Sequence, residues 1–192
     1  MMARADRGMS SAGITSVRIR QAHGFALIDL LFVCGIVGVL CSVALPNLFR
    51  ARQTAGAASA IGSMRVVNSA ELTYALTCGA GFYAPSLKTL GAAPPGSSEP
   101  FITRSLGMAD TVVKSGYQIQ VAATAYDGAP PSCNGLAAGE GGRGFKAAAD
   151  PVDPDNVRHF ATNAGNIIYE HTASLWTVVP ESGTPASGHP LH

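Results

Sequence analysis

An apolar run from Phe25 to Leu45 constrains this chain more than any other part of its sequence. The run is 21 residues long and holds one charged side chain, Asp29. An α-helix rises about 1.5 Å per residue, so the run reaches roughly 31 Å, which matches the apolar thickness of a bilayer. The sequence therefore predicts a helix that spans a membrane near the start of the chain.

Asp29 is the unusual residue of this run. A carboxylate at mid-depth in a bilayer costs on the order of 3 kcal/mol on insertion scales, and it usually has a partner or a function. The run contains no Lys or Arg. We therefore expect the partner of Asp29 to come from outside the run.

The residues around the run resemble the N-terminal signature of type IV pilins and pseudopilins. The resemblance rests on Gly-Phe-Ala-Leu-Ile-Asp-Leu-Leu at 24–31, the apolar run, and then Ala-Leu-Pro-Asn-Leu at 44–48. The family has Gly-Phe-Thr-Leu-Ile-Glu-Leu, an apolar stretch and Ile-Pro-Asn, so Asp29 stands where the usual residue is Glu. The alternative interpretation is an ordinary signal-anchor helix that tolerates one acid.

The resemblance implies a route of processing and assembly. A prepilin peptidase would cut between Gly24 and Phe25, remove the leader 1–24, and N-methylate Phe25. Asp29 would then pair with the N-terminal amine of a neighbouring subunit. The implied partners are further copies of the chain, the peptidase, an inner-membrane assembly platform and an assembly ATPase.

Charge predicts the orientation of the chain and gives no direct evidence of a nucleic-acid partner. The leader carries an excess of arginine, which the positive-inside rule places in the cytoplasm. Arg50 and Arg52 follow the run and weaken this contrast, so the orientation depends partly on the family. The formal net charge is +1, which is not the large positive excess typical of nucleic-acid-binding domains. We expect a single-pass protein of the bacterial inner membrane that enters a periplasmic or surface filament.

The helix is expected to continue beyond the membrane to residue 77. Pro46 lacks a backbone donor and should kink the helix between an assembly half, 25–46, and an amphipathic half, 47–78. Helical spacing places one group of residues on the face toward a globular head and a second group opposite. The first group is Ile61, Met64, Asn68, Leu72 and Ala75, and the second is Ser63, Val66, Ala70 and Thr73.

Residues 79–180 are predicted to form this head. Glycines at 79 and 81 end the helix, and Ser86–Gly91 reads as one helical turn within a mixed connector over 82–114. Alternation and turn residues then predict short strands at 117–123, 145–149, 157–162 and 166–170, with a possible edge strand at 176–179. The expected fold is α+β and pilin-like, a long N-terminal helix packed on a small antiparallel sheet, with a loose tail at 181–192.

The four cysteines divide between the two parts of the chain. Cys34 and Cys41 lie in the apolar run, where packing is the simpler interpretation and lipidation or cross-linking the alternative. Cys78 and Cys133 lie in the predicted head, outside the cytoplasm, where a disulfide is permitted. Closing that loop would contribute roughly 4 kcal/mol in the chain-entropy model. Two free thiols are the alternative.

Candidate chemistry elsewhere is sparse. Asp150, Asp153 and Asp155 lie between prolines, and as oxygen ligands they are weak candidates for calcium, which some pseudopilins bind in their heads. Their spacing is not that of an EF-hand, and a solvated turn is the alternative. No catalytic motif is present, so we expect no enzyme activity and no other cofactor or metal.

These features favour a structural subunit of a type IV pilus-like filament. A pseudopilin of a type II secretion system is the alternative within the family. A bitopic membrane protein that does not polymerise and whose head binds a ligand or partner is the alternative from another class. Adhesion, motility, DNA uptake and protein secretion are all compatible with the filament prediction.

Overall fold

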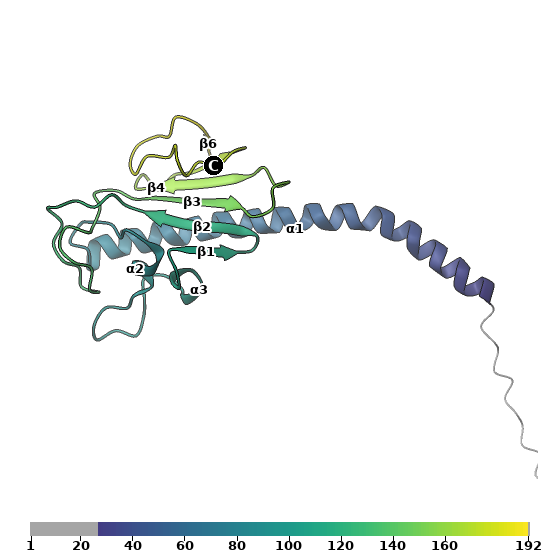
Figure 1. Ribbon diagram of the computed structural model, residues 1–192, viewed down its shortest axis with the longest axis horizontal. Coiled ribbons are helices and arrows are strands. Elements are labelled where there is room, and N and C mark those ends of the chain that lie inside the picture. Colours follow the sequence, from purple (N-terminus) through teal and green to yellow (C-terminus); the bar gives the residue numbers. More distant parts are fainter. Residues whose placement is uncertain (1–26, 192) are drawn as a thin grey trace, which may run out of the picture. The chain divides into compact units, whose positions relative to one another are not determined.

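The computed structural model describes residues 27–191 and divides the chain into two compact units (Figure 1). The units are Met1–Ala44 and Leu45–His192, and each is described here by itself. Both contain part of α1, the helix Leu27–Thr77. The predicted leader 1–24 and Phe25 lie outside the described residues.

In the first unit, α1 carries apolar side chains on all of its faces. Every described residue before Leu45 is exposed, including Leu27 at 74% and Phe32 at 70%. Among the described residues, α1 is the one helix long and apolar enough to cross a membrane, as judged by length and composition. The sequence prediction of a spanning helix agrees with this finding.

In the second unit, α1 buries one face against the head. The buried residues recur every three or four positions, which is the period of a helix side that packs on a core; they are Gly56, Ala57, Ala60, Ser63, Met64, Val67, Asn68, Ala70, Glu71, Tyr74 and Ala75. Ser63 and Ala70 were predicted on the opposite face, and Leu72 was predicted to be buried. Those predictions are wrong, because the buried face is centred on Val67 and Glu71, and this centring leaves Leu72 45% exposed.

The end of α1 follows its sequence signals. The backbone N–H groups of Cys78 and Gly79 both donate to the carbonyl of Tyr74, and Gly81 N–H donates to Ala75. A side chain at Gly79 would collide with the carbonyl of Phe82, so close approach requires this glycine. Gly81 supplies a positive φ of 92°. The predicted stop after Thr77 is confirmed.

Two short helices form the connector between α1 and the sheet. α2 is Leu87–Gly91, and Ser86 is its N-cap. The Ser86 hydroxyl accepts a hydrogen bond of 3.3 Å from Thr89 N–H. This turn was predicted. α3, Arg104–Gly107, was not predicted, and it packs so closely on α2 that a Cβ atom at Gly107 would lie 2.5 Å from the Cα of Gly91.

Six antiparallel strands form one sheet in sequence order (Figure 1). They are β1 (Thr111–Lys114), β2 (Tyr117–Ala122), β3 (Lys146–Pro151), β4 (His159–Asn163), β5 (Ile168–His171) and β6 (His189–Pro190). The four central strands, β2 to β5, confirm the strands predicted from alternation and turn residues. Together with α1 they establish the α+β class.

Both edges of the sheet differ from the sequence prediction. The residues of β1 were assigned to the connector, and 176–179 is not a strand. Its Val179 instead packs with Leu175 on the sheet face remote from α1. The edge is completed by β6, which lies in the tail predicted to be loose. That tail is attached, because Asn163 donates to the carbonyl of Gly183 at 2.7 Å and Leu191 N–H donates to Ile168 at 2.8 Å.

The turn between β1 and β2 fixes the distance between the sheet and α1. Ser115 and Gly116 have φ values of 51° and 81°, the left-handed conformations of a two-residue hairpin turn. A Cβ atom at Gly56 would lie 2.7 Å from the carbonyl oxygen of Ser115. Gly56 therefore allows the turn to lie directly on the helix.

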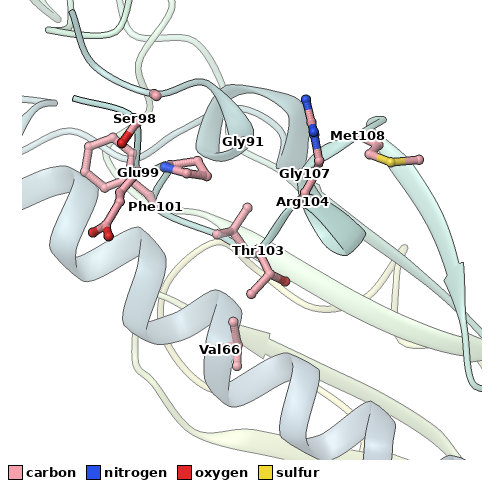
Figure 2. A pocket seen from close by; sticks show the side chains of 12 residues that line it. Val66, Gly91, Ser98, Glu99, Phe101, Thr103, Arg104, Gly107 and Met108 are labelled. Atoms are coloured by element: carbon pink, nitrogen blue, oxygen red, sulfur yellow. The ribbon is translucent and has the colours of Figure 1, made fainter. Parts of the chain in front are cut away.

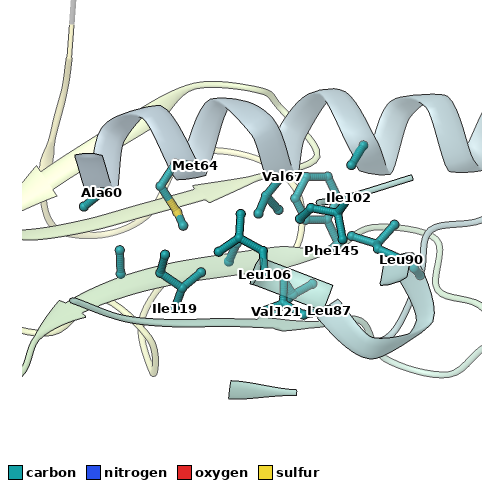
Figure 3. Close-up of a cluster of buried hydrophobic side chains, with 14 of the residues drawn as sticks. Ala60, Met64, Val67, Leu87, Leu90, Ile102, Leu106, Ile119, Val121 and Phe145 are labelled. Atoms are coloured by element: carbon teal, nitrogen blue, oxygen red, sulfur yellow. The ribbon is translucent and has the colours of Figure 1, made fainter. Parts of the chain in front are cut away.

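The main core lies between the head part of α1, the connector and one face of the sheet (Figure 3). Met64 and Val67 of α1 meet Leu106 of α3 and Ile119 of β2, and all four side chains are fully or almost fully buried. A second, smaller cluster covers the other face of the sheet. Burying both faces explains why Ala148 and Ala161 of the central strands are apolar as well.

Candidate functional site: an exposed apolar helix and the polar groups of the head

The strongest candidate for a functional surface is the apolar part of α1, residues 27–49, which we call the assembly segment. Its side chains are exposed on every side of the helix in the described chain. Exposed apolar patches of this extent mark surfaces that bind lipid or protein. The assembly segment is therefore a candidate surface for contact with lipid or protein.

Asp29 lies in the first described turn of α1 and is exposed. The two ion pairs found in residues 27–191 do not include it. In the sequence, Asp29 follows shortly after the predicted cleavage residues Gly24 and Phe25, which lie outside the described residues. The predicted pairing of Asp29 with an amine remains a prediction.

Pro46 lies inside α1, close to the boundary of the two units. The helix assignment continues through it to Thr77. The predicted kink at Pro46 stays a prediction, because Pro46 adjoins the boundary between two units whose relative placement is not determined. Arg50 and Arg52 follow Pro46 within two turns, at the end of the continuous run of exposed residues that includes Leu48 and Phe49.

The head is cross-linked by the predicted disulfide, Cys78–Cys133. It joins the end of α1 to the long loop between β2 and β3, 55 residues later in the sequence. Cys133 N–H also donates to the carbonyl of Cys78 at 3.1 Å. Cys34 and Cys41 are free and exposed on the assembly segment, so the division of the cysteines between the two parts is confirmed.

The three calcium candidates do not gather around one point. Asp150 accepts hydrogen bonds from Ser174 Oγ at 2.9 Å and pairs with His159 Nδ1 at 2.7 Å. Asp153 instead accepts from the backbone N–H of Asp155 at 3.0 Å. Within the described part of the chain, no group of three or more His, Cys, Asp or Glu side chains has the arrangement of a metal site.

An ion pair joins β5 to the loop before β4. The guanidinium of Arg158 donates from two nitrogens to the two carboxylate oxygens of Glu170. This contact lowers the pKa of Glu170 below its usual value and raises the pKa of Arg158. A bidentate pair of this kind holds its two side chains in one orientation, although Arg158 remains partly exposed.

A groove lies between the outer side of α1 and the connector (Figure 2). It has a volume of about 820 Å³. Apolar side chains such as Val66, Phe101 and Met108 line it, with the charged groups of Glu99 and Arg104. The sequence did not predict this groove, because α3, which forms part of it, was not predicted.

The sequence analysis also missed a buried acid in the head, Glu71. Its carboxyl is inaccessible to solvent, and burial raises its pKa to about 8, while a hydrogen bond from Ala84 N–H opposes the shift. A signal was available, since Glu71 follows Met64 and Val67 at seven and four residues and so falls on the same helix face.

No protein-family model, curated protein or solved structure matches this chain.

Proposed function

We propose that this chain is a structural subunit of a type IV pilus-like filament, processed at Gly24 and polymerised through its N-terminal helix. The observation that carries the proposal is the assembly segment: a helix apolar on every side, with the single acid Asp29 near its start. The order Gly24, Phe25, Asp29 and Pro46 in the sequence is that of the pilin signature.

The assembly segment would have two environments during its life. Before assembly, lipid would cover it as a membrane span in the inner membrane. After extraction by the assembly platform and its ATPase, the same surface would be covered by the helices of neighbouring subunits. Positions 34, 38 and 42 hold Cys, Gly and Ser, which permit close helix approach because they are small and share one face.

Asp29 would set the position of each subunit relative to the next. A carboxylate and an α-amino group are each costly in an apolar environment, and each becomes less costly when the two pair. The amine would be that of Phe25 of a neighbouring copy, exposed by removal of the leader. The pair would favour one axial register among the many that an apolar surface alone permits.

The head would form the outer surface of the filament. A disulfide and an attached tail make it a cross-linked unit, which suits an extracytoplasmic location.

The test is mass spectrometry of the intact protein and of its N-terminal peptide, from membrane and from sheared-surface fractions. The proposal predicts a chain that begins with N-methylated Phe25 and occurs in the sheared fraction. A processed chain confined to membranes would favour the pseudopilin alternative. An intact leader, or a cut after residue 45, would contradict the proposal and favour an anchored or secreted head that does not polymerise.

A further inference from the structure

A buried carboxyl on the head side of α1 has no part in the proposed filament function. Glu71 has no exposed surface, and its Oε1 has no hydrogen-bond partner among the residues that the structure describes. Its other oxygen, Oε2, accepts a hydrogen bond of 2.9 Å from Ala84 N–H. This bond joins α1 to the start of the connector, two residues before the first turn of α2.

Among the residues that the structure describes, no cationic side chain forms an ion pair with Glu71. The two ion pairs of the described chain, Arg158–Glu170 and His159–Asp150, do not involve it. On α1 the titratable neighbour is Tyr74, whose buried hydroxyl has a raised pKa and is neutral. From the connector the neighbour is Ala84, which supplies only its backbone N–H. The buried hydroxyl of Tyr74, like Glu71 Oε1, has no hydrogen-bond partner among the described residues.

We propose that Glu71 is a proton-operated latch: its neutral carboxyl holds Ala84 against α1, and loss of the proton releases the beginning of the connector. A neutral carboxyl can remain in the core with one hydrogen bond, whereas a buried carboxylate without a cation is strongly unfavourable. The ionised side chain therefore moves toward water and leaves Ala84 N–H without its acceptor.

The direction of titration supports this behaviour. Burial, the largest influence, raises the pKa of Glu71 to about 8, and the bond from Ala84 opposes it without cancelling it. The latch is therefore closed at neutral pH and opens under mildly alkaline conditions. In the unfolded chain the carboxyl titrates near its ordinary value of 4.5. The contribution of Glu71 to stability is thus complete below about pH 4.5 and is lost progressively as the pH rises to about 8.

Neighbouring hydrogen bonds limit how far the connector opens. Before Ala84, Tyr83 exchanges two backbone hydrogen bonds with Gly142, of 2.8 and 3.1 Å. After it, Asn134 Nδ2 donates to the carbonyls of Thr89 and Ala92, at 2.7 and 3.1 Å. Ala84 and Leu87 are themselves buried in the main core, and Leu90 N–H donates to the carbonyl of Ser86, so release is confined to the backbone around Ala84 and leaves the rest of the head folded.

The protonation state is tested by infrared difference spectroscopy of the full-length chain in detergent micelles across a pH titration. The latch predicts one protonated-carboxyl band that persists at pH 7 and disappears with a midpoint near pH 8. The band should be absent from Glu71→Gln and retained in the matched control Glu99→Gln, whose carboxyl belongs to an exposed residue. Absence of the band from the wild type at pH 7, or its presence in Glu71→Gln, would overturn the proposal.

The opening itself is tested by amide hydrogen exchange, with each rate corrected for its intrinsic pH dependence. Protection of Ala84 should fall by roughly tenfold or more between about pH 6.5 and pH 9.5, while protection of Tyr83 is unchanged. In Glu71→Gln the protection of Ala84 should not depend on pH. If that variant does not fold, the comparison of Ala84 with Tyr83 in the wild type decides alone. Constant protection of Ala84 would overturn the latch, whatever the outcome for the filament.

Discussion

Two parts of one helix, α1, differ in the exposure of their apolar side chains. Between residues 27 and 49 its apolar side chains are exposed. Between Gly56 and Ala75 one side is buried by the connector and the sheet, so that Met64 and Val67 have no exposed surface. Apolar content alone therefore does not determine what covers a helix. Within the second unit the connector and the sheet cover one side of α1; for the first part, we propose that neighbouring copies of the chain supply the cover.

The largest effect is expected from truncating an apolar residue of α1 that the head covers. Met64→Ala should lower the free energy of unfolding of the head by about 2–5 kcal/mol, because it leaves a cavity in the main core. The matched control is Leu40→Ala on the assembly segment, which is 64% exposed and should leave head stability unchanged. Urea unfolding in detergent checks both. Equal losses in the two variants would remove the distinction between the two parts of α1.

A somewhat smaller loss is expected from opening the disulfide of the head. Replacing Cys78 and Cys133 together by Ala should cost about 2–4 kcal/mol, since the bridge restricts the unfolded chain. Replacing Cys34 and Cys41 together by Ala should not change head stability, because both are free thiols of the assembly segment. Thermal unfolding followed by circular dichroism distinguishes the two double variants. Destabilisation by the second pair alone would contradict the account.

The smallest effect concerns the ion pair of Arg158 and Glu170. The pair lowers the pKa of Glu170, so its stabilisation is present above about pH 4.5 and is lost as the pH falls through the lowered folded-state pKa. Arg158 is partly exposed, so solvent screening keeps the contribution below about 1 kcal/mol.

Urea midpoints between about pH 6 and pH 3 test this ion pair. The difference between the wild type and Glu170→Gln should shrink as the pH falls, and Glu99→Gln should show no such trend. A difference that grows toward acid pH would contradict the assignment. Glu71, whose effect lies between about pH 4.5 and pH 8, is present in the wild type and in Glu170→Gln alike, so its contribution cancels in this difference.

Much of the fold could be predicted because its signals are local. The length of α1 follows from an apolar run and a region with only one proline, and the strands β2 to β5 follow from alternation and from the Asn-Ala-Gly turn at 163–165. The turn residues of β1–β2, Ser115 and Gly116, were also a local signal and would have predicted β1. That omission was avoidable.

Other features depend on contacts that the sequence does not display. The two-residue strand β6 exists because β5 offers it an edge, and nothing in its own residues indicates a strand. The burial of Ser63 and Ala70 in place of Leu72 depends on the angle at which the sheet meets α1. The charge environment of Glu71 likewise depends on which residues surround it. The assembly segment differs from these features, because its apolar surface and its single acid, Asp29, can both be read directly from the local sequence.

The central claim is that the assembly segment is covered by other copies of the chain and that Asp29 sets their register. The most direct measurement is the amount of this protein in sheared surface filaments from cells that carry wild type, Asp29→Ala or Asp29→Glu. The account predicts normal membrane insertion and head stability in all three, filaments with Asp29→Glu, and none with Asp29→Ala. Wild-type amounts of filament from Asp29→Ala would contradict it.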